Sequence, residues 1–158
     1  MRGVFEEDQI IMDPKQRLRH GHGYSQSEMY AIKHDHLERV PDAIIYPKEE
    51  EATSLVQTAS KHSVCLIPFG GGTNVSEALE CPQNEKRMIV SVDIQRMNRI
   101  IWIDAINRMA CIEAGAVGRH IMEDLAKYDL TMGPRAQQCR IFYSWRMNSN
   151  ERQRHEKA

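Results

Sequence analysis

The sequence contains 158 residues, of which 41% are hydrophobic and 27% are charged, proportions close to those of an average globular protein. This length suits one domain, or one domain with terminal arms. Because 21 basic and 22 acidic residues leave a net charge of −1, overall charge does not direct the chain to an anionic membrane or to nucleic acid. We therefore expect no nucleic-acid partner.

The sequence lacks the usual marks of membrane and secreted proteins. No stretch approaches the roughly 18 consecutive apolar residues of a transmembrane helix, and the N-terminus lacks the apolar core of a signal peptide. The cysteines are far apart in sequence and form no C-x-x-C pair; they are Cys65, Cys81, Cys111 and Cys139. We expect reduced thiols in an intracellular protein.

The chain divides into three segments of different composition. Residues 1–38 form a polar, histidine-rich N-terminal arm with little periodicity, and residues 39–133 have the pattern of a folded α/β unit. Residues 134–158 are rich in arginine and show no amphipathic repeat. The folded unit is therefore expected in the middle of the chain.

Two H-x-H pairs in the N-terminal arm are candidate metal ligands. The histidines are His20 and His22, then His34 and His36. A metal site needs three or four converging donors, so we assign no metal site and expect a solvated arm instead.

The first elements of the middle segment are a strand and a helix. Residues 43–46 are apolar and end at Pro47, which predicts a short strand. Helical spacing of apolar residues predicts a helix over residues 49–62, with three glutamates in its first turn that favour the helix dipole. The residues of its expected buried face are Ala52, Leu55, Val56 and Ala59.

The later elements complete a small α/β fold. Apolar runs predict strands at residues 64–69 and 88–92. Residues 100–104 and 109–114 flank a four-residue polar turn, which predicts an antiparallel hairpin. Helical spacing predicts a second helix over residues 118–128. We expect an α/β (α+β) fold in which two helices pack on one face of a small sheet.

The segment after the 64–69 strand carries the clearest binding signal. It reads PFGGGTNVS, and its three successive glycines allow a ligand to approach the backbone closely. Successive amide groups in such a turn converge on an anion and suit a diphosphate. The candidate binding residues are Pro68, Phe69, Gly70, Gly71, Gly72, Thr73, Asn74, Val75 and Ser76. Neither the Walker A pattern nor G-x-G-x-x-G is present, and a turn without ligand is the alternative.

Five segments together resemble one family of flavoproteins. They are RLRHGHG (Arg17–Gly23), RVPDAIIYP (Arg39–Pro47), CLIPFGGGTNVS (Cys65–Ser76), SVDIQRMNRIIWID (Ser91–Asp104) and EAGAVG (Glu113–Gly118). They resemble the flavin-binding domain of the p-cresol methylhydroxylase (PCMH) / vanillyl-alcohol oxidase superfamily. The MNRI run and the His-Gly-His segment resemble its alkylglycerone-phosphate synthase family. The chain would then hold the first lobe of a PCMH-type FAD-binding domain.

This resemblance implies a cofactor, a reaction and a compartment. The family uses FAD to exchange the acyl group of acyl-dihydroxyacetone phosphate for a fatty alcohol, without net oxidation, in the peroxisomal synthesis of ether lipids. By position, Pro68–Ser76 would hold the FAD diphosphate, and Glu113–Gly118 would lie close to the cofactor. The resemblance also implies an active-site role for His20 and His22 in a full-length enzyme, and a homodimer. A truncated, inactive flavin- or nucleotide-binding module is the alternative function.

The resemblance stops after Gly133, where the family continues with G-H-E-P-x-S-x-E-F-S-T-x-G-G-W. Permitted codons for residues 134–146, translated one base later, give H-E-P-N-S-A-E-F-S-T-L-G. We therefore interpret residues 134–158 as a disordered tail translated out of frame. A chain with only the first lobe is expected to bind FAD weakly, because FAD needs most of its surface enclosed.

Three other residues have alternative interpretations. Asp93 and Asp104 are candidate general bases, but each ends a predicted strand and is expected to accept turn hydrogen bonds instead. Trp102 lies in an alternating strand and is expected in the core, with stacking on a flavin as the alternative. No catalytic residue is assigned from the sequence.

Overall fold

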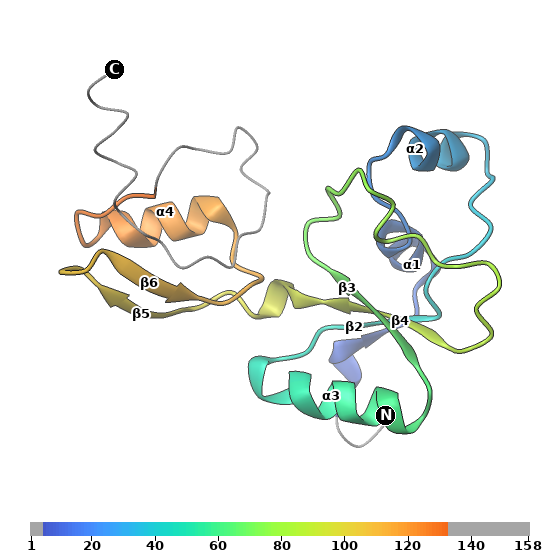
Figure 1. Ribbon diagram of the computed structural model, residues 1–158, viewed down its shortest axis with the longest axis horizontal. Helices are drawn as coiled ribbons and strands as arrows, with labels where there is room; N and C mark the ends of the chain where they lie inside the picture. The colour runs from blue at the N-terminus through green and yellow to red at the C-terminus, as the bar shows by residue number, and fades with distance from the viewer. Residues whose placement is uncertain (1–4, 133–158) are drawn as a thin grey trace. The chain divides into compact units, whose positions relative to one another are not determined.

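The computed structural model describes residues 5–132, which belong to two compact units (Figure 1). The boundary between the units lies between Arg96 and Met97. The segment predicted as one folded unit, residues 39–133, contributes to both of them. The predictions for residues 134–158 lie outside the described residues.

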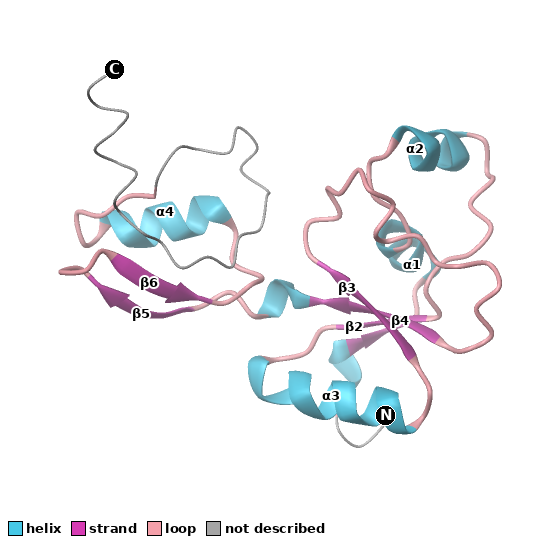
Figure 2. Cartoon of the chain, in the orientation of Figure 1, coloured by secondary structure: helices cyan, strands magenta, loops and turns pink. Residues whose placement is uncertain are grey.

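The first unit is built on a four-stranded sheet with the strand order β1-β2-β4-β3 (Figure 2). The strands are β1 (Ile10–Ile11), β2 (Ala43–Ile45), β3 (Cys65–Phe69) and β4 (Ile89–Asp93). β4 is parallel to both of its neighbours, whereas β1 pairs antiparallel to β2. The predicted strands are thus confirmed, and β1 is an addition that the sequence did not indicate.

Helix α3 (Glu49–Lys61) covers one face of this sheet (Figure 1). Leu55 and Ala59 are buried, and Leu55 packs in a cluster that contains Val90 of β4. The predicted helix is confirmed, but Val56 is 60% exposed and was wrongly placed on the buried face. Successive residues of a helix are rotated by about 100°, so the side chain next to Leu55 turns away from a narrow contact stripe.

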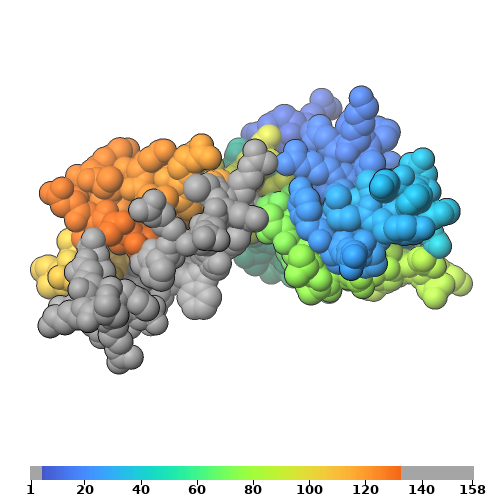
Figure 3. Space-filling view, turned by 90° about the horizontal axis from the view of Figure 1, so that it is seen from above, coloured from blue at the N-terminus to red at the C-terminus, as the bar shows by residue number. Residues whose placement is uncertain are grey.

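The opposite face of the sheet is covered by the N-terminal segment and by the loop between β3 and β4, which contributes Leu79 and Cys81 to the core (Figure 1). The N-terminal segment is seen from above as the blue and cyan atoms of Figure 3. This segment contains the short helices α1 (Pro14–His20) and α2 (Gln26–Lys33), which the sequence analysis did not predict. Both start at capping residues: the Asp13 side chain accepts a hydrogen bond from a helix amide, and Ser25 forms a capping box. Local caps therefore define these helices despite their weak hydrophobic periodicity.

The second unit is a hairpin with one helix packed on it. The hairpin consists of β5 (Ile100–Asp104) and β6 (Met109–Ile112), and the helix is α4 (Gly118–Ala126). Its core contains Ile112, Ile121 and Leu125 among other apolar residues. The predicted hairpin and helix are confirmed. The two predicted helices do not share one sheet, however, because α3 and α4 belong to different units.

One prediction in the second unit is wrong, because Trp102 is 46% exposed rather than buried in the core. The pairing of β5 with β6 is irregular between Ile100 and Trp102. A shift of one residue moves a side chain to the other face of a hairpin, so simple alternation placed Trp102 on the wrong side.

The fold class is α/β, with small sheets and helices on their faces, as predicted. Among the helices of residues 5–132, none combines the length and the apolarity that a membrane crossing requires.

Candidate functional site

The glycine-rich loop leaves the sheet at the carboxyl end of β3. Phe69, the last residue of the strand, is buried, and Gly70 and Gly71 are partly exposed. The chain then reaches the surface, where Thr73, Val75 and Ser76 are exposed. The predicted turn is therefore present at an accessible edge of the first unit.

Gly72 is the position in the loop that requires glycine. Its φ angle is +66°, in the left-handed region. A Cβ atom there would lie 2.9 Å from Cζ of Phe69, closer than a real contact allows. The backbone at Gly72 thus rests directly on the Phe69 ring, an approach that a side chain would block.

The amide groups of the loop are unpaired within the described residues. Between residues 5 and 132, no acceptor receives a hydrogen bond from a backbone N–H of Gly70 to Ser76. The next amide that is paired is that of Ala78, which donates to Oδ1 of Asn74 at 3.1 Å. A run of unpaired amides beside small residues is a suitable cradle for phosphate oxygens. The residues present therefore fit the diphosphate of FAD.

The loop packs against the segment Arg17–Gly23, which also resembles the flavoprotein family. The amide of Tyr24 donates to the carbonyl oxygen of Asn74 at 2.7 Å. A Cβ atom on Gly23 would lie 2.5 Å from the same oxygen. The structure thus brings together two of the five segments that carry the resemblance, although about 50 residues separate them in the sequence.

Glu28 of α2 fixes the approach of Gly23 to the loop. Its carboxylate accepts hydrogen bonds from the amides of Gly23, at 2.7 Å, and Ser25, at 3.0 Å. Burial raises the pKa of Glu28, but hydrogen bonds from Ser25 and Gly23 outweigh burial and leave the pKa below its ordinary value. Glu28 is therefore an ionised structural acceptor.

The four candidate histidines have different environments. His20 is buried and contacts Asp93 of β4, whereas Nδ1 of His22 lies 2.9 Å from the carbonyl oxygen of Gly23. His34 and His36 are exposed. In the described part of the chain, no group of three or more histidine, cysteine, aspartate or glutamate side chains is arranged to hold a metal ion.

Asp93 and Asp104 make the turn hydrogen bonds that were predicted for them. Oδ1 of Asp93 accepts from the amide of Gln95 at 2.9 Å. Asp104 accepts from the amides of Ile106 and Asn107 and from the Asn107 side chain. Hydrogen bonds from Asn107 and Ile106 lower the pKa of Asp104, which suits a fixed acceptor better than a proton carrier.

The segment Glu113–Gly118 belongs to the second unit, between β6 and α4. The buried Glu113 carboxylate contacts the Arg99 guanidinium at 2.8 Å and also accepts from the Arg99 amide. This pair ties the segment to the residue that precedes β5. The position of this segment near the cofactor stays a prediction.

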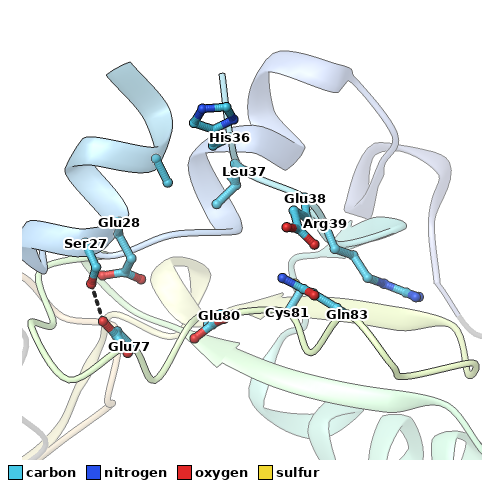
Figure 4. A pocket seen from close by; sticks show the side chains of 11 residues that line it. Ser27, Glu28, His36, Leu37, Glu38, Arg39, Glu77, Glu80, Cys81 and Gln83 are labelled. Carbon is cyan, nitrogen blue, oxygen red and sulfur yellow. Dashed lines mark hydrogen bonds between the residues drawn. The ribbon is translucent and has the colours of Figure 1, made fainter. Parts of the chain in front are cut away.

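A cavity of about 230 Å³ lies beside the loop segment rather than on it (Figure 4). Its lining includes the carboxylates of Glu28, Glu38, Glu77 and Glu80 together with Arg39. Four carboxylates beside one guanidinium do not favour an anionic diphosphate. We therefore do not place the cofactor in this cavity.

The contact between His20 and Asp93 was not predicted from the sequence. These residues are 73 positions apart and belong to two different sequence segments, Arg17–Gly23 and Ser91–Asp104. No short-range pattern could have paired them, because α1 and the end of β4 come together only when the first unit folds.

The comparisons with known proteins agree on the family. Residues 41–142 match the model of the FAD binding domain. The alkyldihydroxyacetonephosphate synthase of Trypanosoma brucei brucei is 36% identical over 135 residues, which is 84% of this chain. A solved alkyldihydroxyacetonephosphate synthase is 32% identical over 89% of this chain, with a TM-score of 0.83. A solved p-cresol methylhydroxylase with substrate bound has a TM-score of 0.63 at 18% identity over 82% of this chain and 24% of its own, which supports the fold alone.

The chain is much shorter than these relatives. It spans 22% of the trypanosome synthase and 27% of the solved synthase chain. The matching family model nevertheless covers well over half of this sequence. This chain belongs to the FAD binding domain family of flavoproteins and is homologous to part of the alkyldihydroxyacetonephosphate synthases.

Proposed function

We propose that this chain supplies the FAD-binding portion of an alkylglycerone-phosphate synthase. Such an enzyme is a transferase that exchanges the acyl group of acyl-dihydroxyacetone phosphate for a fatty alcohol, a step of ether lipid synthesis. The observation that carries the proposal is the run of unpaired amides from Gly70 to Ser76 in a chain of the FAD binding domain family.

The residues of the glycine loop would act by binding and orientation. The amides of Gly70, Gly71 and Gly72 would donate to the diphosphate, because glycine leaves the backbone open to the ligand. The exposed hydroxyls of Thr73 and Ser76 would add neutral donors. When bound, FAD supplies the redox-active isoalloxazine ring, and the loop would hold the diphosphate that links the flavin half of the molecule to its adenosine half.

The first test is direct binding of FAD to the purified 158-residue chain. Titration of FAD with protein is expected to change flavin fluorescence and to give a weak affinity, because one lobe encloses only part of the cofactor. Gly71→Asp, which adds a negative charge beside the proposed diphosphate, is the test variant. Asp35→Asn is a control at an exposed position. Equal affinity for the Gly71→Asp variant and the unchanged chain would contradict the proposal.

The second test concerns the reaction. We expect no synthase turnover from these 158 residues alone, since the relatives that perform the reaction are several times longer. Residues 17–133 grafted into a full-length homologous synthase, in place of its matching segment, are expected to support product formation from acyl-dihydroxyacetone phosphate and a long-chain alcohol. An inactive graft that still binds FAD would instead favour a flavin-binding module without catalysis.

Location and assembly follow from the same proposal. A peroxisomal location and a homodimer are proposed for the full-length protein. Fluorescence microscopy of a tagged full-length protein tests the location, and light scattering tests the dimer. A diffuse signal or a monomer would overturn the corresponding part.

A further inference from the structure

His20 is buried and bonded at both ring nitrogens. Its Nδ1 lies 2.8 Å from the carbonyl oxygen of Gln16, and its Nε2 lies 2.8 Å from Oδ2 of Asp93. A carbonyl oxygen only accepts hydrogen bonds, so Nδ1 carries a hydrogen. The other ring nitrogen, Nε2, is hydrogen-bonded to the carboxylate of Asp93, a side chain that is only 5% exposed. Both ends of the ring are therefore fixed by atoms that belong to different elements.

The face of the His20 ring packs on Phe69. The two ring centroids are 4.0 Å apart and the planes are tilted by 35°. On the loop side, the Phe69 ring lies directly beneath the backbone of Gly72. A continuous stack thus leads from α1, through Phe69, to the glycine loop.

Asp93 anchors this stack in the sheet. It ends β4 and is paired in register with Phe69 of β3. Its Oδ1 accepts from the amide of Gln95, so the carboxylate cannot rotate without loss of a second hydrogen bond. The anchor is therefore built on two neighbouring parallel strands, which hold a site more precisely than a loop does.

The environment of His20 argues against direct chemistry. The residue is 4% exposed and is in contact with Phe69 and Tyr46 on its ring surface. Among the described residues, no third metal-ligating side chain joins His20 and Asp93. Both ring nitrogens of His20 are already hydrogen-bonded within the protein. A group enclosed in this way can act on the loop only through the residues that it touches.

We infer that His20 and Asp93 form a positioning pair for the glycine loop. The pair holds the Phe69 ring in place, and the ring in turn sets the backbone at Gly72 and the direction of the neighbouring amides. This inference rests on the proposed function only for the identity of the ligand, FAD. The effect of the pair on the conformation of the loop is testable without any ligand.

The test uses amide signals of the glycine loop in ¹H–¹⁵N NMR spectra of the full 158-residue chain. The sequence has nine glycines, so the signals of Gly70, Gly71 and Gly72 are few enough to assign. Asp93→Ala and His20→Gln are expected to shift these signals and to weaken FAD binding on the order of tenfold, the scale at which small displacements of binding groups act. Unmoved glycine signals in both folded variants would overturn the inference.

Asp93→Asn provides the conservative rescue. The asparagine oxygen can still accept from the Gln95 amide, while its NH₂ group can donate to Nε2 of a neutral His20. This variant is expected to keep the loop signals and the FAD affinity within about twofold of the unchanged chain. If Asp93→Asn changes the loop signals and the FAD affinity as much as Asp93→Ala does, the pair does not act by positioning the loop.

Leu55→Ala is the matched control for loss of stability. Leu55 packs on the other face of the same sheet, so this change destabilises the first unit without contact to Phe69. It is expected to leave the signals of Gly70 to Gly72 in place, and a shift like that of His20→Gln would overturn the inference. If the unchanged chain fails to bind FAD, the proposed function fails, while the NMR comparison still decides the role of the pair.

Discussion

Gly72 shows how one residue determines the shape of the candidate site. Its φ of +66° and the Phe69 ring beneath it both exclude a larger residue. We predict that Gly72→Ala lowers the free energy of unfolding by about 1–2 kcal/mol, the cost of a left-handed conformation for an L-residue. Urea denaturation measures this change. Gly71→Ala is the control, since Gly71 has no positive φ, and an equal loss in both variants would contradict the prediction.

Glu28 makes the stability of the first unit depend on pH. Because the pKa of this carboxyl group is lowered in the folded state from its ordinary value of 4.5, its contribution is present above pH 4.5 and is lost as the pH falls through the folded-state pKa. We predict that Glu28→Gln costs about 1–2 kcal/mol at pH 7, since one buried amide donor loses its acceptor.

The difference between Glu28→Gln and the unchanged chain is expected to shrink as the pH falls through the lowered folded-state pKa of Glu28, because the glutamate then becomes protonated. Unfolding by urea at pH 7 and pH 3 measures both values. Glu50→Gln, at an exposed position of α3, is expected to change stability by less than about 0.5 kcal/mol at either pH. A difference that stays constant even where acid protonates Glu28 would show that the charge of Glu28 does not contribute.

The glycine loop was readable from the sequence because its chemistry is local. Three adjacent glycines after an apolar run need no tertiary information to indicate a turn with open amides. The contact between His20 and Asp93 was not readable, since it depends on the packing of α1 against the end of β4. For the same reason His20 was interpreted as a solvated, metal-ligating or active-site residue, although it is 4% exposed and packed against the end of β4.

At the scale of elements, α3 illustrates both the strength and the limit of periodicity. The spacing predicted its extent closely, yet it assigned Val56 to the buried face along with Leu55. We predict that Leu55→Ala costs about 2–5 kcal/mol, because it leaves a cavity under the helix. Val56→Ala is expected to cost less than about 1 kcal/mol. Thermal and urea unfolding measure both, and equal losses would contradict the observed orientation of the helix.

The hairpin and the N-terminal helices were less predictable for physical reasons. The irregular pairing between Ile100 and Trp102 turns the Trp102 side chain to the exposed face of the hairpin, and nothing in the amino-acid composition of the strand indicates this irregularity. Helices α1 and α2 have seven and eight residues, too short for a clear hydrophobic period, and they depend on caps and on tertiary contacts.

At the scale of the whole molecule, the reading frame after Gly133 is the most direct prediction. We predict that the coding DNA, read one base later from the end of the Gly133 codon, encodes H-E-P-N-S-A-E-F-S-T-L-G. Sequencing of genomic and messenger nucleic acid from the source measures this directly. Codons incompatible with that shifted frame would refute the interpretation of residues 134–158 as an out-of-frame tail.

The central place of β4 has a consequence for how the protein is made. This strand is the last of the four to leave the ribosome, yet it fills the gap between β2 and β3. A nascent chain that has not yet emerged to Asp93 would therefore present β2 and β3 as two unpaired edges with an apolar seam between them. Chaperones that bind exposed apolar strands would therefore be needed most after β3 has emerged and before β4 has paired with β2 and β3.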